Sequence, residues 1–130
     1  MKIIALIYPM LFLTPFLANA ETASEYDVLY GKCLSNSGPI NNGVVAACSE
    51  KVSSRAKSEI NLRYKSIYAR LLAESSKDAQ KLDASQKSWL LYRNHHCELA
   101  GYYIGSPMYG YCPMKLNAAR ALELRELDGE

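Results

Sequence analysis

After residue 20 the sequence has no apolar run long enough to cross a membrane and no excess of charge of either sign. A membrane-spanning helix needs about 20 consecutive apolar residues, so no span is expected in residues 21–130. Removing Lys2 from the 15 basic residues leaves 14 basic against 13 acidic ones, a net charge of about +1 with histidine neutral. Because nucleic-acid binding needs a basic patch or stripe, no nucleic-acid partner is predicted.

Motifs that carry chemistry are also missing. The chain has no G-x-S-x-G, P-loop, dinucleotide fingerprint or C-x-x-C. His95 and His96 are adjacent, so on a helix they cannot share a face as an i,i+4 metal pair does. The carboxylates, including Glu98, are spread along charged faces. We therefore predict no catalytic residue, no cofactor and no metal site, and expect a protein that is not an enzyme.

The first 20 residues have the pattern of a cleaved secretory signal peptide. Lys2 precedes a nearly pure apolar stretch, and small residues at Ala18 and Ala20 match a signal-peptidase site. The apolar run is shorter than a membrane span and contains two prolines. We expect cleavage near Ala20, a periplasmic or secreted protein, and a single domain over residues 21–130.

Four cysteines in a short exported chain indicate two disulfides, for which three pairings are possible. Cys33 and Cys48 are 15 residues apart, and so are Cys97 and Cys112. If each pair brackets a connection between two helices, each bridge closes one helical hairpin. The spacing therefore favours Cys33–Cys48 and Cys97–Cys112.

Apolar residues recur at helical spacing along the chain, and no strand pattern competes. We expect a short helix over residues 25–34, a long one over 44–74 with a polar middle at 53–58 that bends or packs loosely, and a second long one that begins after Ser75 or Ser76. The predicted fold class is an all-α, disulfide-bonded bundle with two long antiparallel helices and shorter flanking helices.

The segment from Gly101 to Cys112 is rich in glycine and tyrosine, and we expect it to be non-helical. Pro113 would then lie in the first turn of a last helix that ends near Leu127. Its helical spacing continues through Leu116, Ala119, Arg120, Glu123 and Leu127, or through Leu122 and Leu124.

Tyrosine with glycine and serine on a constrained loop is typical of binding surfaces. A bridge between Cys97 and Cys112 would pin both ends of the loop and lower the ordering cost of binding. The alternative, weighed equally, is that these tyrosines close the end of the bundle. The candidate partner-binding residues are Tyr102, Tyr103, Ser106, Tyr109 and Tyr111. Trp89 and Tyr92 are expected in the core, with Arg93 paired to a carboxylate or capping a helix end.

Three blocks resemble the lysozyme-inhibitor LprI-type family. They are Ile60-Asn61-x-x-Tyr64, Gln86-x-x-Trp89-x-x-Tyr92-Arg93-x-x-x-Cys97 and Cys112-x-x-x-Leu116-x-x-x-Arg120. Cys33 and Cys48 match the upstream cysteines of the family. Two positions depart from its pattern: Ile104 replaces a glycine of the family's Gly-Gly-Ser, and Asn117 replaces a threonine. The matching residues Asn61, Tyr64, Gln86, Trp89, Tyr92, Arg93 and Arg120 are expected to be structural.

The resemblance implies a helical, exported protein. It favours an inhibitor that binds lysozyme or a related peptidoglycan-cleaving enzyme. The alternatives are an immunity-type or accessory protein that binds a specific toxin or envelope protein, and a structural envelope domain.

Overall fold

The computed structural model describes residues 24–129, which form four helices. They are α1 (Glu25–Ser35), α2 (Asn42–Glu74), α3 (Ser76–Tyr103) and α4 (Met108–Asp128). No strand occurs in this part of the chain, so the predicted all-α class is confirmed. The expected signal segment and its cleavage site lie outside the described residues.

Polar residues at the helix starts explain where the first three helices begin. Ser24 forms a capping box at the start of α1. Asn41 and Ser75 each accept a hydrogen bond from the amide three residues ahead, at 3.1 and 3.4 Å, and so begin α2 and α3. Such caps satisfy amides that have no partner within the helix.

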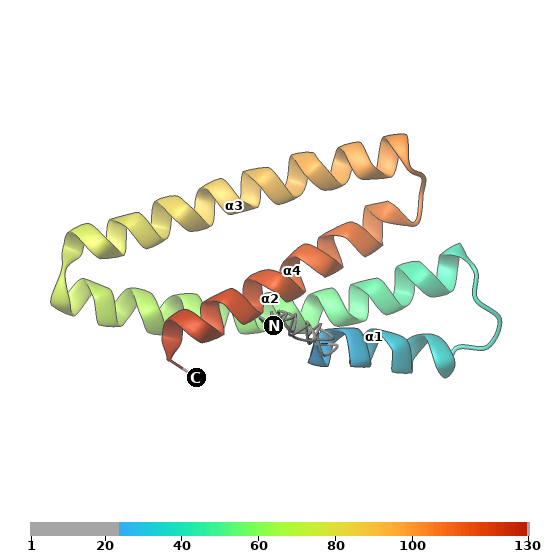
Figure 1. The fold of residues 1–130 in the computed structure, drawn as a ribbon, viewed down its shortest axis with the longest axis horizontal. Helices are drawn as coiled ribbons and strands as arrows, with labels where there is room; N and C mark the ends of the chain where they lie inside the picture. Colours follow the sequence, from blue (N-terminus) through green and yellow to red (C-terminus); the bar gives the residue numbers. More distant parts are fainter. Residues whose placement is uncertain (1–23, 130) are drawn as a thin grey trace, which may run out of the picture.

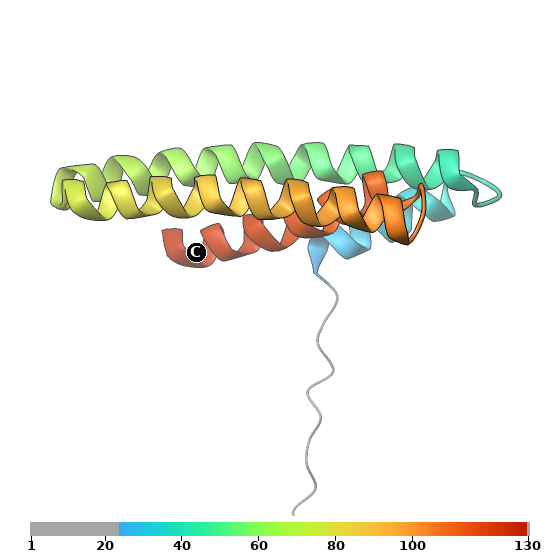
Figure 2. The ribbon, with the colours of Figure 1, turned by 90° about the horizontal axis from the view of Figure 1, so that it is seen from above.

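The helices lie lengthwise in an elongated bundle (Figure 1). α2 and α3 form the long antiparallel pair, and α1 and α4 lie on the same side of it (Figure 2). The α1–α2 and α3–α4 turns are at one end, and the α2–α3 turn is at the other (Figure 1). Asn42 at the start of α2 donates to Ser106 in the α3–α4 turn at 3.3 Å, which joins the two turns.

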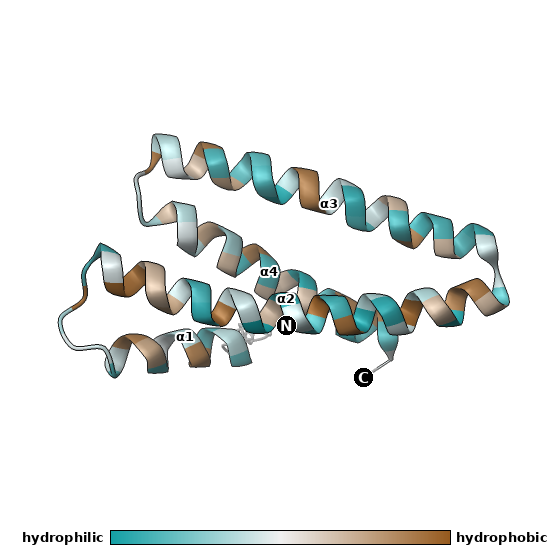
Figure 3. Cartoon of the chain, turned by 180° about the vertical axis from the view of Figure 1, so that it is seen from behind, coloured by the Kyte–Doolittle hydropathy of each residue, from teal (hydrophilic) through white to brown (hydrophobic). Residues whose placement is uncertain are grey.

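The apolar core lies mainly between α2 and α4. It contains Ile60 and Ile67 of α2, Leu124 of α4 and the Tyr26 ring of α1. Hydrophobic and hydrophilic residues are interspersed along the whole length of α2 and α3 (Figure 3). No helix in the described range is long and apolar enough to cross a membrane.

The middle of α2 is tightly packed where its sequence is most polar. Ser53 and Ala56 are 4% and 0% exposed, and Asn117 of α4 donates to the Ser53 hydroxyl at 2.7 Å. The expected loose packing at residues 53–58 is therefore wrong. Small side chains allow close approach of two helices, because the distance between helix axes depends on the side chains at the contact.

The segment expected to be non-helical is mostly helical. α3 continues to Tyr103 and α4 begins at Met108, which leaves residues 104–107 as the turn. Pro113 therefore lies inside α4 rather than in its first turn, and Pro107 is at the N-cap instead.

Gly101 in this segment permits close packing rather than breaking a helix. A Cβ at Gly101 would overlap the Tyr109 ring, whereas a Cβ at Gly110 would make only ordinary van der Waals contact, 3.5 Å from the Ser49 side chain of α2. Only Gly105 in this segment has a left-handed backbone, with φ of +137°, a region that glycine adopts readily. Glycine here indicates contact as well as a turn.

The buried face of α4 also differs from one of the two predicted stripes. Leu124 is 1% exposed, whereas Leu127 is 55% exposed. The small or polar residues Asn117, Ala118 and Ala121 form most of the remaining buried face. The spacing of large apolar side chains does not reveal a buried face made mostly of small or polar residues.

Candidate functional site

Two disulfides fasten the end of the molecule that carries both hairpin turns. Cys33–Cys48 joins α1 to α2, and Cys97–Cys112 joins α3 to α4, with Cα–Cα distances of 5.6 and 5.4 Å. This is the pairing that the equal spacing favours. Cys97 and Cys112 are both buried and form a small apolar cluster with Ala100. The second bridge therefore fixes the two helices on either side of the α3–α4 turn.

The turn is held by backbone and side-chain hydrogen bonds. The Met108 amide donates to the Gly105 carbonyl at 3.0 Å, and the Tyr111 amide donates to the Pro107 carbonyl at 3.0 Å. The hydrogen bond from Asn42 to Ser106 adds a link to α2. Ser106, a predicted binding residue, thus has a structural contact in the isolated chain.

Four large side chains project from this end. Tyr102 and Tyr103 are each 76% exposed, Ile104 is 73% exposed and Tyr109 is 55% exposed. The Tyr102 and Tyr103 rings meet edge to face, with centroids 5.0 Å apart. We call Tyr102, Tyr103, Ile104 and Tyr109 the aromatic end. Large apolar side chains gathered in an exposed patch are typical of interaction sites.

Tyr111, another predicted binding residue, does not belong to the aromatic end. It is half-buried and packs against the core. Its ring lies 5.5 Å from that of Tyr30 on α1. The two interpretations of the tyrosine segment thus apply to different residues: Tyr111 packs inward, while the aromatic end faces solvent.

The exposed apolar surface continues from the aromatic end along α3. Tyr92 and Leu99 are 54% and 57% exposed, and His96 stacks on Tyr92 with centroids 5.4 Å apart. Tyr92, His96, Leu99 and Tyr103 follow i, i+4, i+7 and i+11 spacing, which places them on one helical face. The prediction that Tyr92 lies in the core is therefore wrong, because the buried side of α3 carries Cys97 and Ala100 instead.

The family-like residues of α3 and α4 form a connected network. The Arg93 guanidinium donates to Asn117 at 2.9 Å and lies 5.1 Å from the centre of the Trp89 ring. Arg120 donates to Gln86 at 3.0 Å and approaches the same ring at 5.8 Å. Cations over an aromatic face are attracted to its quadrupole, so the indole of Trp89, which is half-buried, lies between residues of two helices.

Asn117 is the centre of this network. It is 1% exposed, donates to Ser53 of α2 and accepts from Arg93 of α3. The expected carboxylate partner or helix-cap role of Arg93 is wrong, because its partners are Asn117 and the neighbouring Asn94. Burial lowers the pKa of the Arg93 guanidinium. A buried polar group needs such partners, so one amide ties together three helices.

The residues of the first family-like block lie across from this network. Tyr64 donates to Asp83 of α3 at 3.2 Å, and Asp83 pairs with Lys87 at 2.7 Å. Asn61 and Tyr64 line one side of a groove of about 480 Å³ between α2 and α3, with Gln86 and Trp89 on the other. Residues of the three blocks that resemble the family therefore meet at this groove and in the network beside it.

One cluster was missed by the sequence analysis. Tyr26 of α1 donates to Glu59 of α2, and Arg125 of α4 donates to the two oxygens of Glu59 at 2.7 and 2.8 Å. Arg125 also reaches Glu25 at 2.6 Å. Because Glu59 and Arg125 are far apart in sequence, no local pattern connects them. The i,i+4 spacing of Glu59 and Arg63 was the one available signal.

The charges and burial of this cluster shift the pKa values of Glu59 and Tyr26. The Arg125 guanidinium lowers the pKa of Glu59 to about 2, with a further contribution from the Tyr26 hydroxyl. Burial raises the pKa of Tyr26, and the hydrogen bond to Glu59 raises it further. The cluster is a set of matched charges that joins α1, α2 and α4.

The histidine, cysteine and carboxylate side chains near residues 95–98 do not gather into one site within the described range. Cys97 is disulfide-bonded, and His96 stacks on Tyr92. No group of three or more potential ligands gathers within residues 24–129. Glu98 is exposed beside Tyr109 at a shallow depression on the α3–α4 hairpin.

The fold and the site define a small all-α protein with two disulfide-closed hairpins and an exposed aromatic end. A family model described as lysozyme inhibitor LprI matches residues 33–124. Because this match covers most of the chain, the protein belongs to the LprI family. No curated protein and no solved structure is significantly similar to it.

Proposed function

We propose that this protein is an exported inhibitor that binds a lysozyme-class peptidoglycan hydrolase through the aromatic end. The observation that carries the proposal is the exposure of Tyr102, Tyr103 and Ile104, each more than 70% exposed, at the tip of a disulfide-closed hairpin. The description of the family supports the class of partner.

The chemistry of the aromatic end suits contact with a protein. A tyrosine ring supplies a large contact area with few rotatable bonds, and its hydroxyl can still form hydrogen bonds. The Cys97–Cys112 bridge and the turn hydrogen bonds hold the tip before a partner arrives. A pre-organised surface loses less conformational entropy on binding. The α3–α4 turn, which carries the aromatic end, lies toward one end of an elongated molecule (Figure 1), a position that suits entry into a concave cleft of the partner.

Two features support export to the periplasm or beyond. The first 20 residues have the pattern of a signal peptide, and disulfides persist in oxidising compartments. We expect the mature protein to begin after Ala20 and to meet a hydrolase of the cell envelope.

The four side chains of the aromatic end carry no formal charge. Electrostatic steering by these residues is therefore expected to be weak. Affinity should change little with ionic strength, because salt screens charge interactions and leaves apolar burial in place.

A lysis assay tests the proposal. Oxidised protein spanning residues 21–130 is added to lysozyme acting on bacterial cell walls, with Tyr102→Ala/Tyr103→Ala as the test variant. The control variant is Leu62→Ala/Leu72→Ala, which removes two apolar side chains that are 65% and 52% exposed in the second half of α2. We expect inhibition by the wild type and the control, and at least about a tenfold loss in the test variant, as for interface hot spots.

No inhibition by folded, oxidised protein at micromolar excess rejects the lysozyme version. Equal inhibition by both variants rejects the aromatic end as the contact surface. The immunity-type alternative uses the same surface, and tight binding to a toxin encoded by a neighbouring gene would favour it. A structural envelope domain predicts no tight partner and no binding effect of either variant.

A further inference from the structure

We propose that a pocket between α1 and α2 binds a phosphate group that carries an apolar substituent. The pocket has a volume of about 530 Å³, which is within the range of small-molecule sites. It lies beside the Cys33–Cys48 bridge and is distinct from the aromatic end. The proposal is independent of the partner of the aromatic end.

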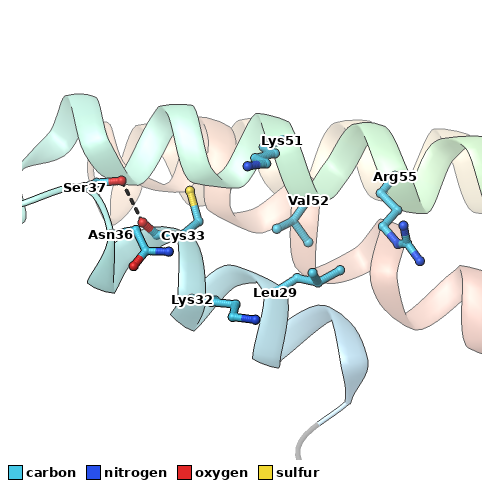
Figure 4. Close-up of a pocket in the computed structure, with 8 residues that line it drawn as sticks. All are labelled: Leu29, Lys32, Cys33, Asn36, Ser37, Lys51, Val52 and Arg55. Atoms are coloured by element: carbon cyan, nitrogen blue, oxygen red, sulfur yellow. Dashed lines mark hydrogen bonds between the residues drawn. The ribbon is translucent and has the colours of Figure 1, made fainter.

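The charges of the pocket have one sign. Lys32 of α1 and Lys51 and Arg55 of α2 line it (Figure 4). Among the residues that the structure describes, no Asp or Glu lines the pocket. Within residues 24–129, the three cationic side chains form no ion pair and no hydrogen bond. By contrast, Arg63, Arg120 and Arg125 are all paired with carboxylates.

The three cations are exposed to solvent, and no carboxylate in the lining offsets their charge. Lys51 and Arg55 are at i and i+4 on one face of α2, where like charges destabilise a helix by a few tenths of a kcal/mol. Lys32 adds a third positive charge from the facing helix. An anion in the pocket would interact favourably with all three cations. A phosphate group matches them, since ammonium and guanidinium groups both bind phosphate oxygens through charge-assisted hydrogen bonds.

The pocket also has an apolar wall. Val52 is 3% exposed and belongs to the core, and Leu29 of α1 packs against that core. Figure 4 shows both side chains directed toward the space between the two helices, close to the basic residues. Apolar surface beside clustered cations favours a phosphate ester with an apolar part over inorganic phosphate.

The walls are held in place without a ligand. The Cys33–Cys48 bridge fixes the two helices at one side of the pocket. The Ser37 hydroxyl donates to the Cys33 carbonyl at 2.6 Å (Figure 4). A preformed pocket reduces the ordering cost of binding.

The first experiment uses phenyl phosphate as the probe and isothermal titration calorimetry on oxidised protein spanning residues 21–130. The test variant is Lys51→Gln/Arg55→Gln, and circular dichroism checks its fold. The matched control is Lys65→Gln/Lys77→Gln, which removes two exposed cations, one in the second half of α2 and one at the start of α3. We expect at least about a tenfold loss of affinity in the test variant and less than about twofold in the control. Inorganic phosphate should bind several-fold more weakly than phenyl phosphate.

A second arm separates the two sources of such a group. Flotation with phosphatidylglycerol and phosphatidylcholine vesicles tests a lipid headgroup. If the protein binds phenyl phosphate but not the vesicles, and this binding depends on Lys51 and Arg55, the ligand is a soluble ester. If it binds only phosphatidylglycerol vesicles, with the same dependence, the ligand is a lipid headgroup. The proposal is overturned if neither probe binds, if both variants lose the same affinity, or if inorganic phosphate binds as well as phenyl phosphate.

Discussion

The two helical hairpins are closed by disulfides of the same span, yet their surfaces differ. In the α1–α2 hairpin the bridge has one half-buried cysteine, Cys33, which lines the basic pocket. In the α3–α4 hairpin both cysteines are buried in a small apolar cluster, and the turn beyond them carries the aromatic end. A bridge of equal length thus lies beside a pocket lined by cations and apolar side chains in one hairpin, and beside an apolar projecting surface in the other.

The hairpins also depend on their bridges to different extents. α1 is an 11-residue helix, and isolated helices of that length are marginal in water. The bridge holds it near its end, and near its start it is held by the buried Tyr26, which contacts Glu59, and by the Glu25–Arg125 ion pair. α4 has 21 residues, and its buried face packs along α2 through Asn117, Ala118 and Ala121. Removing each bridge should therefore have a different structural consequence.

The largest expected effect comes from removing the bridges. In the chain-entropy model, each closes a loop of about 15 residues and contributes about 3 kcal/mol. We expect Cys97→Ala/Cys112→Ala to lose somewhat more global stability than that, because two buried sulfur atoms also leave the core. Urea unfolding measures this loss.

Cys33→Ala/Cys48→Ala should instead release α1 first. Hydrogen exchange should become fast throughout Glu25–Ser35 while α2 and α4 stay protected. If both double variants lose the same global stability and α1 stays protected, the proposed contrast between the two hairpins is wrong.

The second effect concerns the ion cluster that joins the first hairpin to α4. The pKa of Glu59 is about 2 in the folded protein, against an ordinary value of 4.5. A lowered folded pKa adds stability above about pH 4.5, and this contribution is lost as pH falls toward 2. Glu59 is 15% exposed, so a contribution on the order of 3 kcal/mol is expected.

The variant Glu59→Gln tests this contribution. Its loss in free energy of unfolding should be largest near neutral pH and should shrink as pH falls from 4.5 to 2. Glu74→Gln removes an exposed carboxylate at the end of α2 and should stay within about 0.5 kcal/mol of the wild type. A loss for Glu59→Gln that does not vary with pH would contradict the assigned role.

The local parts of this fold could be predicted from the sequence. Helical spacing indicated α1 and the long helices, and the boundary near Ser75 follows from its capping side chain. The equal spacing of the cysteines favoured the observed bridges. These features depend on residues that lie close together along the chain.

The predictions that were wrong concern residues whose surroundings depend on a neighbouring helix. Ser53 looks like a solvent-facing residue until Asn117 of α4 is placed against it. Gly101 looks like a helix breaker until Tyr109 is placed over it. The Glu59–Arg125 pair joins residues far apart in sequence. Periodicity reports how one helix is divided into faces, but not which neighbour each face meets.

The candidate site could be predicted only in part, because some of its residues also depend on a neighbouring helix. The composition of residues 101–112 indicated a surface rich in tyrosine, and the exposure of Tyr102 and Tyr103 agrees with that pattern. The inward position of Tyr111 depends on Tyr30 of α1. The basic pocket brings Lys32 together with Lys51 and Arg55, and this meeting follows from the first disulfide rather than from any motif.

The smallest expected effect compares one glycine from each hairpin. A Cβ at Gly31 of α1 would meet nothing within 4 Å, so Gly31→Ala should stabilise the protein by about 0.5–1 kcal/mol through helix propensity. A Cβ at Gly101 of α3 would overlap the Tyr109 ring. Gly101→Ala should therefore lose that gain or reverse it, and thermal unfolding should separate the two variants by about 1 kcal/mol.

The same pair of variants also tests the aromatic end. Gly101→Ala must displace the Tyr109 ring, whereas Gly31→Ala changes an exposed position on α1. If the proposed inhibitor contact includes Tyr109, Gly101→Ala weakens inhibition several-fold and Gly31→Ala leaves it unchanged. A Gly101→Ala variant that gains stability and inhibits normally would mean that the position of the Tyr109 ring serves neither packing nor binding. In that case Tyr102, Tyr103 and Ile104 alone would have to account for the contact.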